Sequence, residues 1–168
     1  MKLISAHIKD LRTLYIDNLR KALDMEQKIT KALPDVIEKV SDPELATALN
    51  NHLEETRGHV RKVEALLKRN TDDATTEACK VIGSLTTEAS DTIKDVTNRQ
   101  ILDIALIGAA QQVEHHEIAV YGTLSRWAEI LGENDDVSDL KSIENEEANA
   151  DKLLSQIAGK VNSLAAAA

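Results

Sequence analysis

The sequence predicts an all-α protein, a bundle of four long helices in two antiparallel hairpins with one short helix between the hairpins. Along four long stretches, apolar residues recur at intervals of three and four, which is the period of a helix. Six glycines and two prolines in 168 residues leave little room for the turns of a β-sandwich. This length suits one domain, so residues 1–168 are expected to form a single domain with its core over about 8–164.

The first helix is expected over residues 8–40, where Pro34 should kink or interrupt it. The next residues carry the signals of a helix start. Ser41 stands three residues before Glu44, the spacing of a capping box, and Pro43 falls in the first turn, where its missing N–H does no harm. The second helix should continue to about residue 69.

A shorter helix is expected over residues 75–94. Its Thr, Ser and Gly content gives it poor helix propensity, which suggests a crossover segment. Thr97 and Gln100 have the spacing of a second capping box, and the helix that follows should end at Gly132. Residues 133–137 are expected as a loop before the last helix. A crossover between two hairpins gives the ferritin-like arrangement.

Charge and cysteine content narrow the possible partners. The formal charge of −9 argues against a nucleic-acid partner, because phosphate binding needs a basic surface. Cys79 is the one cysteine, so an internal disulfide and a thiolate zinc site are excluded. No apolar run reaches the roughly 20 residues of a membrane span, and the first residues do not resemble a signal peptide. A cytoplasmic protein with no membrane partner is therefore expected.

Four glutamates stand at positions where the helical stripes should be apolar. They are Glu26, Glu55, Glu117 and Glu147, one in each long helix. A buried carboxylate needs a partner charge or must become neutral, because an unpaired charge in an apolar interior is costly. Four such acids therefore predict a bundle built around a cation.

The register of the two hairpins supports this prediction. Glu26 lies 15 residues before the turn at residue 41, and Glu55 lies 14 residues after it. At a rise of ~1.5 Å per residue, both stand about 21–22 Å from the turn. Glu117 and Glu147 agree in height within roughly one helical turn by the same count. Each hairpin should therefore bring two carboxylates to one level.

Three further residues could complete the site. His59 and Asp151 each lie four residues beyond one of the acids, and Glu114 lies three residues before another. Four to six oxygens and one imidazole suit iron or manganese, and zinc could bind without redox chemistry. Two metal ions would balance several negative charges that one ion would not.

Each residue taken alone has a simpler explanation. A single acid can sit at the edge of the core with its head in solvent, and His52 or His59 alone would be an ordinary core histidine. His115 and His116 are adjacent, so at most one can point inward, where it could orient a carboxylate. Four acids at one level favour the metal layer over these separate explanations.

Several segments are similar to a known family. EQKITKALP (26–34), HLEETRGHV (52–60), ALIGAAQQVEHHEIAVYGTL (105–124) and ENEEANADKL (144–153) resemble the YciE/YciF family of ferritin-like, rubrerythrin-like bacterial stress proteins. The resemblance implies a four-helix domain, a homodimer and a potential dinuclear metal centre. The positions that it marks as metal ligands are Glu26, Glu55, His59, Glu114, Glu117, Glu147 and Asp151.

The leading hypothesis is therefore a non-haem protein with two metal ions that handles peroxide or O₂ in a stress response. Glu55 and Glu147 are the expected bridging ligands, and Glu26 and Glu117 the expected terminal ligands. The alternative is a structural or interaction protein that binds an unidentified protein partner and carries a vestigial or non-redox metal site.

Overall fold

The structure is a computed structural model that describes residues 8–166. Within that range it contains five helices and no strand: α1 (Leu11–Lys39), α2 (Pro43–Thr71), α3 (Lys80–Asp95), α4 (Arg99–Leu131) and α5 (Asn134–Ala166). The prediction of an all-α protein is thereby confirmed. None of these helices is long and apolar enough to cross a membrane.

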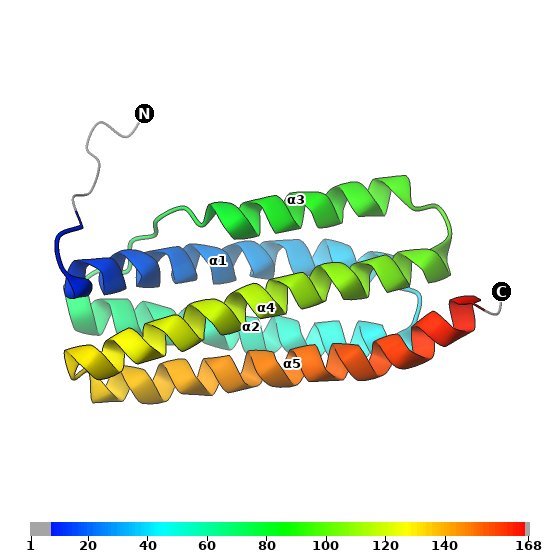
Figure 1. Ribbon diagram of the computed structural model, residues 1–168. Coiled ribbons are helices and arrows are strands. Elements are labelled where there is room, and N and C mark those ends of the chain that lie inside the picture. Colours follow the sequence, from blue (N-terminus) through cyan, green and yellow to red (C-terminus); the bar gives the residue numbers. More distant parts are fainter. Residues whose placement is uncertain (1–7, 167–168) are drawn as a thin grey trace.

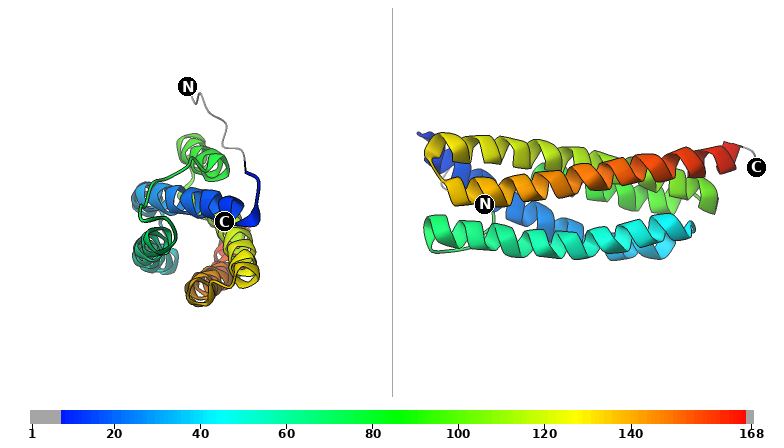
Figure 2. Two further views of the ribbon diagram at one scale, coloured as in Figure 1. Left: turned by 90° about the vertical axis from the view of Figure 1, so that its left-hand side faces the viewer. Right: turned by 90° about the horizontal axis from the view of Figure 1, so that it is seen from below.

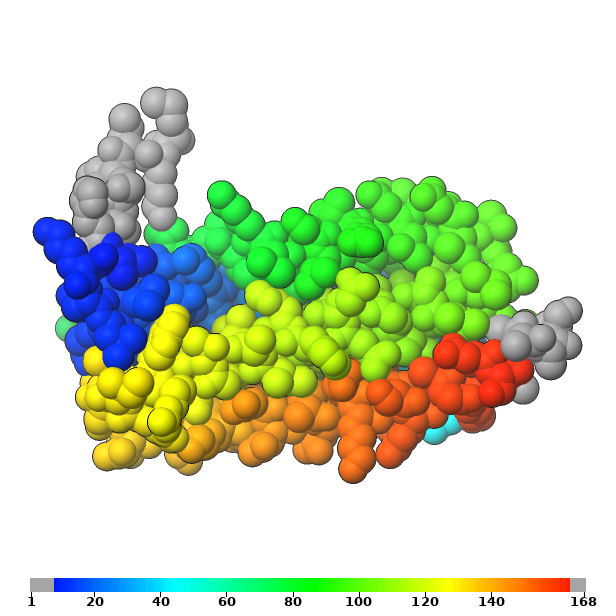
Figure 3. All heavy atoms as spheres, viewed as in Figure 1, coloured from blue at the N-terminus to red at the C-terminus, as the bar shows by residue number. Residues whose placement is uncertain are grey.

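The four long helices lie along one another, and α3 lies outside them (Figure 1). α1 packs on α2 and α4 packs on α5, while α1–α4 and α2–α5 contacts join the two pairs. α3 packs on both α1 and α4. In the end-on view of Figure 2 it lies outside the four long helices, next to α1. The space-filling view places α3 along the upper edge of the elongated molecule (Figure 3).

Asp42, and not the predicted Ser41, caps the start of α2. The Asp42 carboxylate accepts hydrogen bonds from the backbone N–H groups of Glu44 and Leu45, both at 2.9 Å. Ser41 turns instead to the buried Asp103 of α4, to which it donates from its N–H and its hydroxyl. Because the Ser41 hydroxyl donates to Asp103, it does not cap α2, and the neighbouring Asp42 caps the helix instead.

Asn98 caps α4 in the same way, in place of the predicted Thr97. Its side-chain oxygen accepts from the N–H groups of Gln100 and Ile101. At the other end, Gly132 has the left-handed conformation (φ 78°) expected of a helix C-cap. The sequence therefore located this helix correctly but placed its cap one residue too early.

α1 runs through Pro34 to Lys39, close to the end expected for the first helix. Two other boundaries differ from expectation. α3 begins only at Lys80, five residues later than expected. α5 begins at Asn134, so most of the expected loop is helical. Its first turn is held by Asp136, which is buried and accepts a 2.8 Å hydrogen bond from the Tyr15 hydroxyl.

The core between the long helices is aliphatic, with Tyr15 and Tyr121 as its largest fully buried side chains. Glu26, Glu117 and Glu147 lie fully buried in this core, each near the middle of its helix. The bundle therefore places acidic groups where the apolar environment is most continuous.

Asp103→Ala should destabilise the protein by about 2 kcal/mol, because it removes the acceptor of three hydrogen bonds from the turn between α1 and α2. Urea unfolding followed by circular dichroism measures the change. The exposed Asp91→Ala of α3 is the control and should change stability by less than about 0.5 kcal/mol. Equal losses in the two variants would contradict this account of the turn.

Candidate metal centre

Six buried side chains from all four long helices meet midway along the bundle. They form two groups in which one nitrogen or oxygen atom per residue lies within 4.8 Å of the others, and each residue is at most 5% exposed. The first group contains His52, Glu114, Glu117 and Glu147; the second contains Glu26, His59 and Glu147. Glu147 belongs to both. These buried groups could hold a metal ion.

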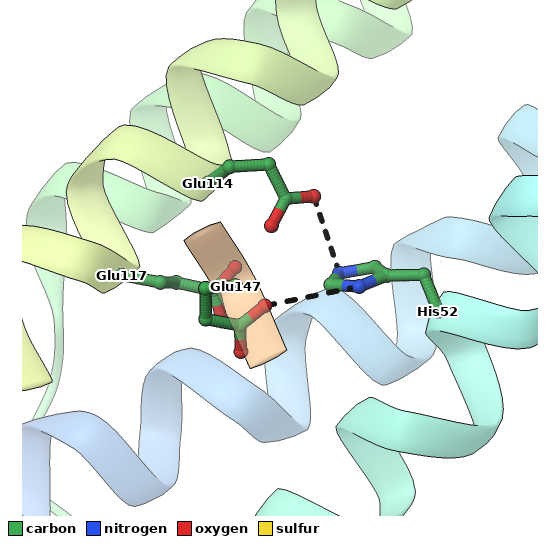
Figure 4. Close-up of side chains that lie close together, drawn as sticks. All are labelled: His52, Glu114, Glu117 and Glu147. Carbon is green, nitrogen blue, oxygen red and sulfur yellow. Dashed lines mark ion pairs between the residues drawn. The ribbon is translucent and has the colours of Figure 1, made fainter. Parts of the chain in front are cut away.

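In the first group, the His52 ring of α2 faces carboxylates from the opposite helices (Figure 4). Its Nε2 lies 3.3 Å from Glu114 Oε1 of α4, and its Nδ1 lies 3.8 Å from Glu147 Oε2 of α5. Glu117 projects from α4 one turn beyond Glu114 toward the same point. Three helices therefore contribute to this group.

In the second group, His59 stands between two acids. Its Nδ1 lies 2.8 Å from Glu147 Oε1 and 3.8 Å from Glu26 Oε2. The shorter contact is within ion-pair distance, but neither atom has the alignment of a hydrogen bond. On the far side of the ring, Nε2 lies 2.7 Å from Glu146 Oε2. Because a carboxylate only accepts, this contact places a proton on Nε2 and directs Nδ1 toward the acids.

Supporting contacts fix two of these side chains. The Tyr121 hydroxyl donates to Glu26 Oε1, which leaves Glu26 Oε2 free to face His59. Glu146 also accepts from Lys62, at 3.0 Å. Hydrogen bonds of this kind hold metal ligands in orientation in many proteins.

The strongest sign of a missing partner is the number of unsatisfied polar atoms. Among the residues that the structure describes, nine buried nitrogen or oxygen atoms of these six side chains have no hydrogen-bond partner. Leaving a buried polar atom unpaired costs about 1–3 kcal/mol, more for a charged group. Native proteins keep few such atoms, so nine at one point fit a site for a cation that would satisfy them together.

Burial makes the acids hold protons when no cation is present. It raises the pKa of Glu26 to about 8 and that of Glu114 to about 10, with the negative charge of Glu147 adding to both shifts. Burial, with the charge of Glu147 next, also raises the pKa of Glu117 well above its ordinary value. A metal ion must therefore displace protons in order to bind.

The two histidines respond differently to their surroundings. Burial lowers the pKa of His52, which favours the neutral ring that a metal ion requires. Burial also acts to lower the pKa of His59, but contacts with Glu147, Glu26 and Glu146 outweigh it and raise the pKa to about 9. The apoprotein therefore carries a positive charge beside its buried acids.

Two of the seven residues predicted as ligands do not join the groups. Glu55 has a side chain that is 50% exposed. It precedes Thr56, the fully buried residue of its turn, so it lies beside the buried stripe of α2 and not within it. Asp151 lies between α4 and α5, where it is 3.3 Å from His115 Nδ1 and accepts from Gln111. The other five predicted residues, Glu26, His59, Glu114, Glu117 and Glu147, do come together.

His52 is the residue that the sequence did not identify as a ligand. It lies seven residues before His59, which is two helical turns, so the two rings share one face of α2. This spacing was the signal in the sequence that could have identified His52 as a ligand. The height of Glu55 matched that of Glu26, but height along a helix says nothing about which face a side chain occupies.

A hollow between α2 and α5 leads to the first group. Its volume is about 190 Å³, and it reaches His52 and Glu114. Its lining is mixed: alanines and leucines form much of it, and Asn51, Glu55 and Asn149 add polar side chains. Glu55 therefore lies on the way to the buried acids and not among them.

Comparisons with known proteins place the chain in a family. Residues 10–167 match the family described as Domain of unknown function (DUF892). The chain belongs to the DUF892 family. Protein YciF of Escherichia coli (strain K12) is 32% identical over 153 residues, which are 90% of this chain and 92% of YciF. The predicted resemblance is thereby confirmed.

Solved structures share the fold of this DUF892 chain. The crystal structure of the E. coli stress protein YciF aligns with a TM-score of 0.89 at 31% identity, over 93% of this chain and 99% of that one. YcfI of Rhodopseudomonas palustris, provisionally described as a structural protein, aligns with a TM-score of 0.88 at 38% identity, over 90% and 97% of the two chains. A Xanthomonas campestris protein at 20% identity shares the fold, with a TM-score of 0.77 over 92% and 95%.

The melting temperature of the metal-free DUF892 protein should fall as the pH rises from about 5 to about 9. A carboxyl with a raised pKa keeps its proton longer in the folded chain than in the unfolded chain, so stability is lost as the pH rises from the ordinary value of 4.5 through the folded pKa, about 8 for Glu26 and about 10 for Glu114. Glu114→Gln cannot ionise and should show a shallower fall, measured by thermal denaturation in the presence of a chelator.

Glu54→Gln is the control for this measurement, because Glu54 is 70% exposed on the outside of α2. Its melting temperature should follow the wild-type dependence on pH. If the melting temperature of Glu114→Gln falls with pH as steeply as that of the wild type, the Glu114 carboxyl does not hold a proton in the folded protein.

Proposed function

We propose that the protein is a ferritin-like metal-binding protein that holds two ions, with iron or manganese as the natural occupants and zinc as a non-redox substitute. The observation that carries this proposal is that four helices direct nine polar atoms without a hydrogen-bond partner among the described residues to one buried point. Two helix pairs joined by a crossover helix agree with the ferritin-like arrangement, in which metal sites form between facing helices.

The two groups assign the ligands. Glu147 is shared, so it is the bridging ligand in this proposal. The first ion would be held with His52, Glu114 and Glu117, and the second with Glu26 and His59. Glu55, expected from the sequence as a second bridge, has no place in this assignment. Four carboxylates balance the charge of two divalent ions, and a set of carboxylates and imidazoles suits iron, manganese or zinc.

Iron or manganese bound there would supply one-electron redox chemistry, which suits reactions with peroxide or O₂. The protein's own residues prepare the site for such an ion. Glu146 keeps the proton of His59 on Nε2, so that Nδ1 is available to bind. Tyr121 fixes one oxygen of Glu26 and leaves the other free. Surrounding leucines and isoleucines exclude bulk water and strengthen each charge interaction.

The relatives support a role in stress. E. coli YciF is described as a stress protein, and it matches this chain over nearly its whole length. We extend that role to this protein, together with the expected single domain, homodimer and cytoplasmic location. In this role, the site would handle the oxidants that accompany stress.

A second candidate is a structural or interaction protein with a non-redox metal ion. It is favoured by the description of the R. palustris relative as structural, at 38% identity. In that case the bound ion would only satisfy the buried acids and stiffen the bundle. The two candidates share the metal site and differ in whether the ion reacts.

Glu147→Gln should reduce the metal content from about two ions per chain to one or fewer, because it removes a ligand from both groups. The substitution keeps the shape of a protonated glutamate, so the bundle should still fold. Glu55→Gln should keep the wild-type metal content. Elemental analysis after loading and gel filtration measures both. Loss of metal in Glu55→Gln with retention in Glu147→Gln would overturn the assignment.

Ferrous loading of the metal-free protein without oxygen, followed by peroxide or O₂, should give an absorbance change and consumption of the oxidant. Glu147→Gln should lose both effects, and free ferrous iron in the same buffer corrects for the reaction in solution. Tight zinc or magnesium occupancy with no oxidant consumption after iron loading would favour the second candidate.

A further inference from the structure

A second hollow reaches the metal centre from the side covered by α3. It lies between α1 and α4, with α3 as its outer wall and α2 at its inner end. Its volume is about 110 Å³, and residues of these four helices line it. In the end-on view of Figure 2, α3 lies on one side of α1, and α2 and α5 lie on the other side.

The walls of this cavity are almost entirely apolar. Ile29, Leu33, Leu49, Leu85, Ile93 and Leu106 contribute aliphatic surface, and alanines keep the space open. Polar side chains of the lining are Asp35, Thr86 and Ser90, of which Asp35 and Ser90 are exposed. A lining of this kind does not hold water well, because a buried water needs two to four polar partners.

The inner end is different, because two buried polar residues reach it. His52 is 5% exposed and neither of its ring nitrogens has a hydrogen-bond partner, and Glu114 is 2% exposed with one unpartnered oxygen. The cavity therefore combines a long apolar section with unsatisfied donors and acceptors at its far end. A ligand that matches it has an apolar body and one polar end.

Ala110 and Ala89 show that the space depends on small side chains. Ala110 of α4 and Ala89 of α3 line facing walls of the cavity. Larger aliphatic residues at either position would fill it, as they do in ordinary helix packing. The N-terminus of α3 is fastened to α1, since Cys79 N–H donates to Asp24 and Lys28 donates to Cys79 O, so the outer wall has a fixed position.

The volume sets the size of the ligand. A cavity of about 150 Å³ lined by aliphatic side chains stays dry and binds benzene or xenon. This hollow of about 110 Å³ is somewhat smaller and is partly open to solvent beside the exposed Asp35 and Ser90, which suits a short unbranched chain. It is too small for a helix or a protein side-chain cluster of a partner.

We propose that this cavity is a binding site for a short aliphatic molecule with one polar end group, whose polar end lies against His52 and Glu114. The site goes beyond the metal-binding function, because apart from His52 and Glu114 its lining residues are not proposed metal ligands. If the proposed function is also correct, the polar end of the ligand lies next to the bound ions, and small organic compounds become the substrate class of the centre.

The test is a titration of the metal-free, full-length protein with 1-butanol, followed by NMR of methyl groups and histidine rings. Methyl signals of Leu85, Ile93 and Leu106 should shift and saturate, and the His52 ring should shift in the same titration. Ala110→Leu should weaken this binding at least tenfold by filling the cavity. Because no metal is present, the result does not depend on whether the metal proposal holds.

Ala119→Leu, an exposed position of α4, is the matched control and should bind as the wild type does. Ala89→Leu blocks the cavity from the opposite wall and replaces Ala110→Leu if that variant does not fold. Shifts that never saturate, or that persist unchanged in both blocking variants, would overturn the proposal. Saturating methyl shifts with no change at His52 would overturn the placement of the polar end.

Discussion

The buried acids at the centre of the bundle are the constraint on which the rest of the structure depends. Four carboxylates and two imidazoles lie almost completely buried, and nine of their polar atoms have no hydrogen-bond partner among the described residues. An interior of leucine and isoleucine would be more stable than this arrangement without a cation. Raised pKa values keep protons on Glu26, Glu114 and Glu117 when no cation is bound, and a metal ion would replace those protons.

The surroundings of the acids are organised to keep their geometry. Tyr121 and Glu146 each fix one side of a ligand, and Asp103 fastens the turn between α1 and α2 to α4. The turn determines how α2 lies against α1, and so it determines where His52 and His59 meet the acids of the other pair. Local hydrogen bonds at the end of the bundle thereby set the position of groups at its middle.

The sequence predicted the helices well because their signals are local. Apolar spacing and Gly132 located the long helices, while caps such as Asp42 depended on a competing contact with Asp103 that only the folded chain contains. The YciF family was recognisable from several long segments, and the family match confirmed it.

The candidate ligands were predicted less completely. Five of the seven predicted residues do come together. They could be predicted because an acid inside an apolar stripe, and a neighbour three or four residues from it, are visible in the sequence. The sequence pointed to Glu55, whereas the structure places His52 in the group. The two residues lie within one turn of α2, and their side chains differ only in the direction in which they leave the helix axis. That direction depends on how α2 is rotated against its neighbours, which single-helix spacing does not specify.

The two hollows give the centre separate entrances on opposite sides of the bundle. One opens between α2 and α5 and has a mixed lining that includes Asn51, Glu55 and Asn149, and the other is almost entirely apolar and lies beneath α3. A metal ion and an organic compound would then enter through different hollows. Both hollows end at His52 and Glu114, so a bound compound and an entering ion would meet at these two residues.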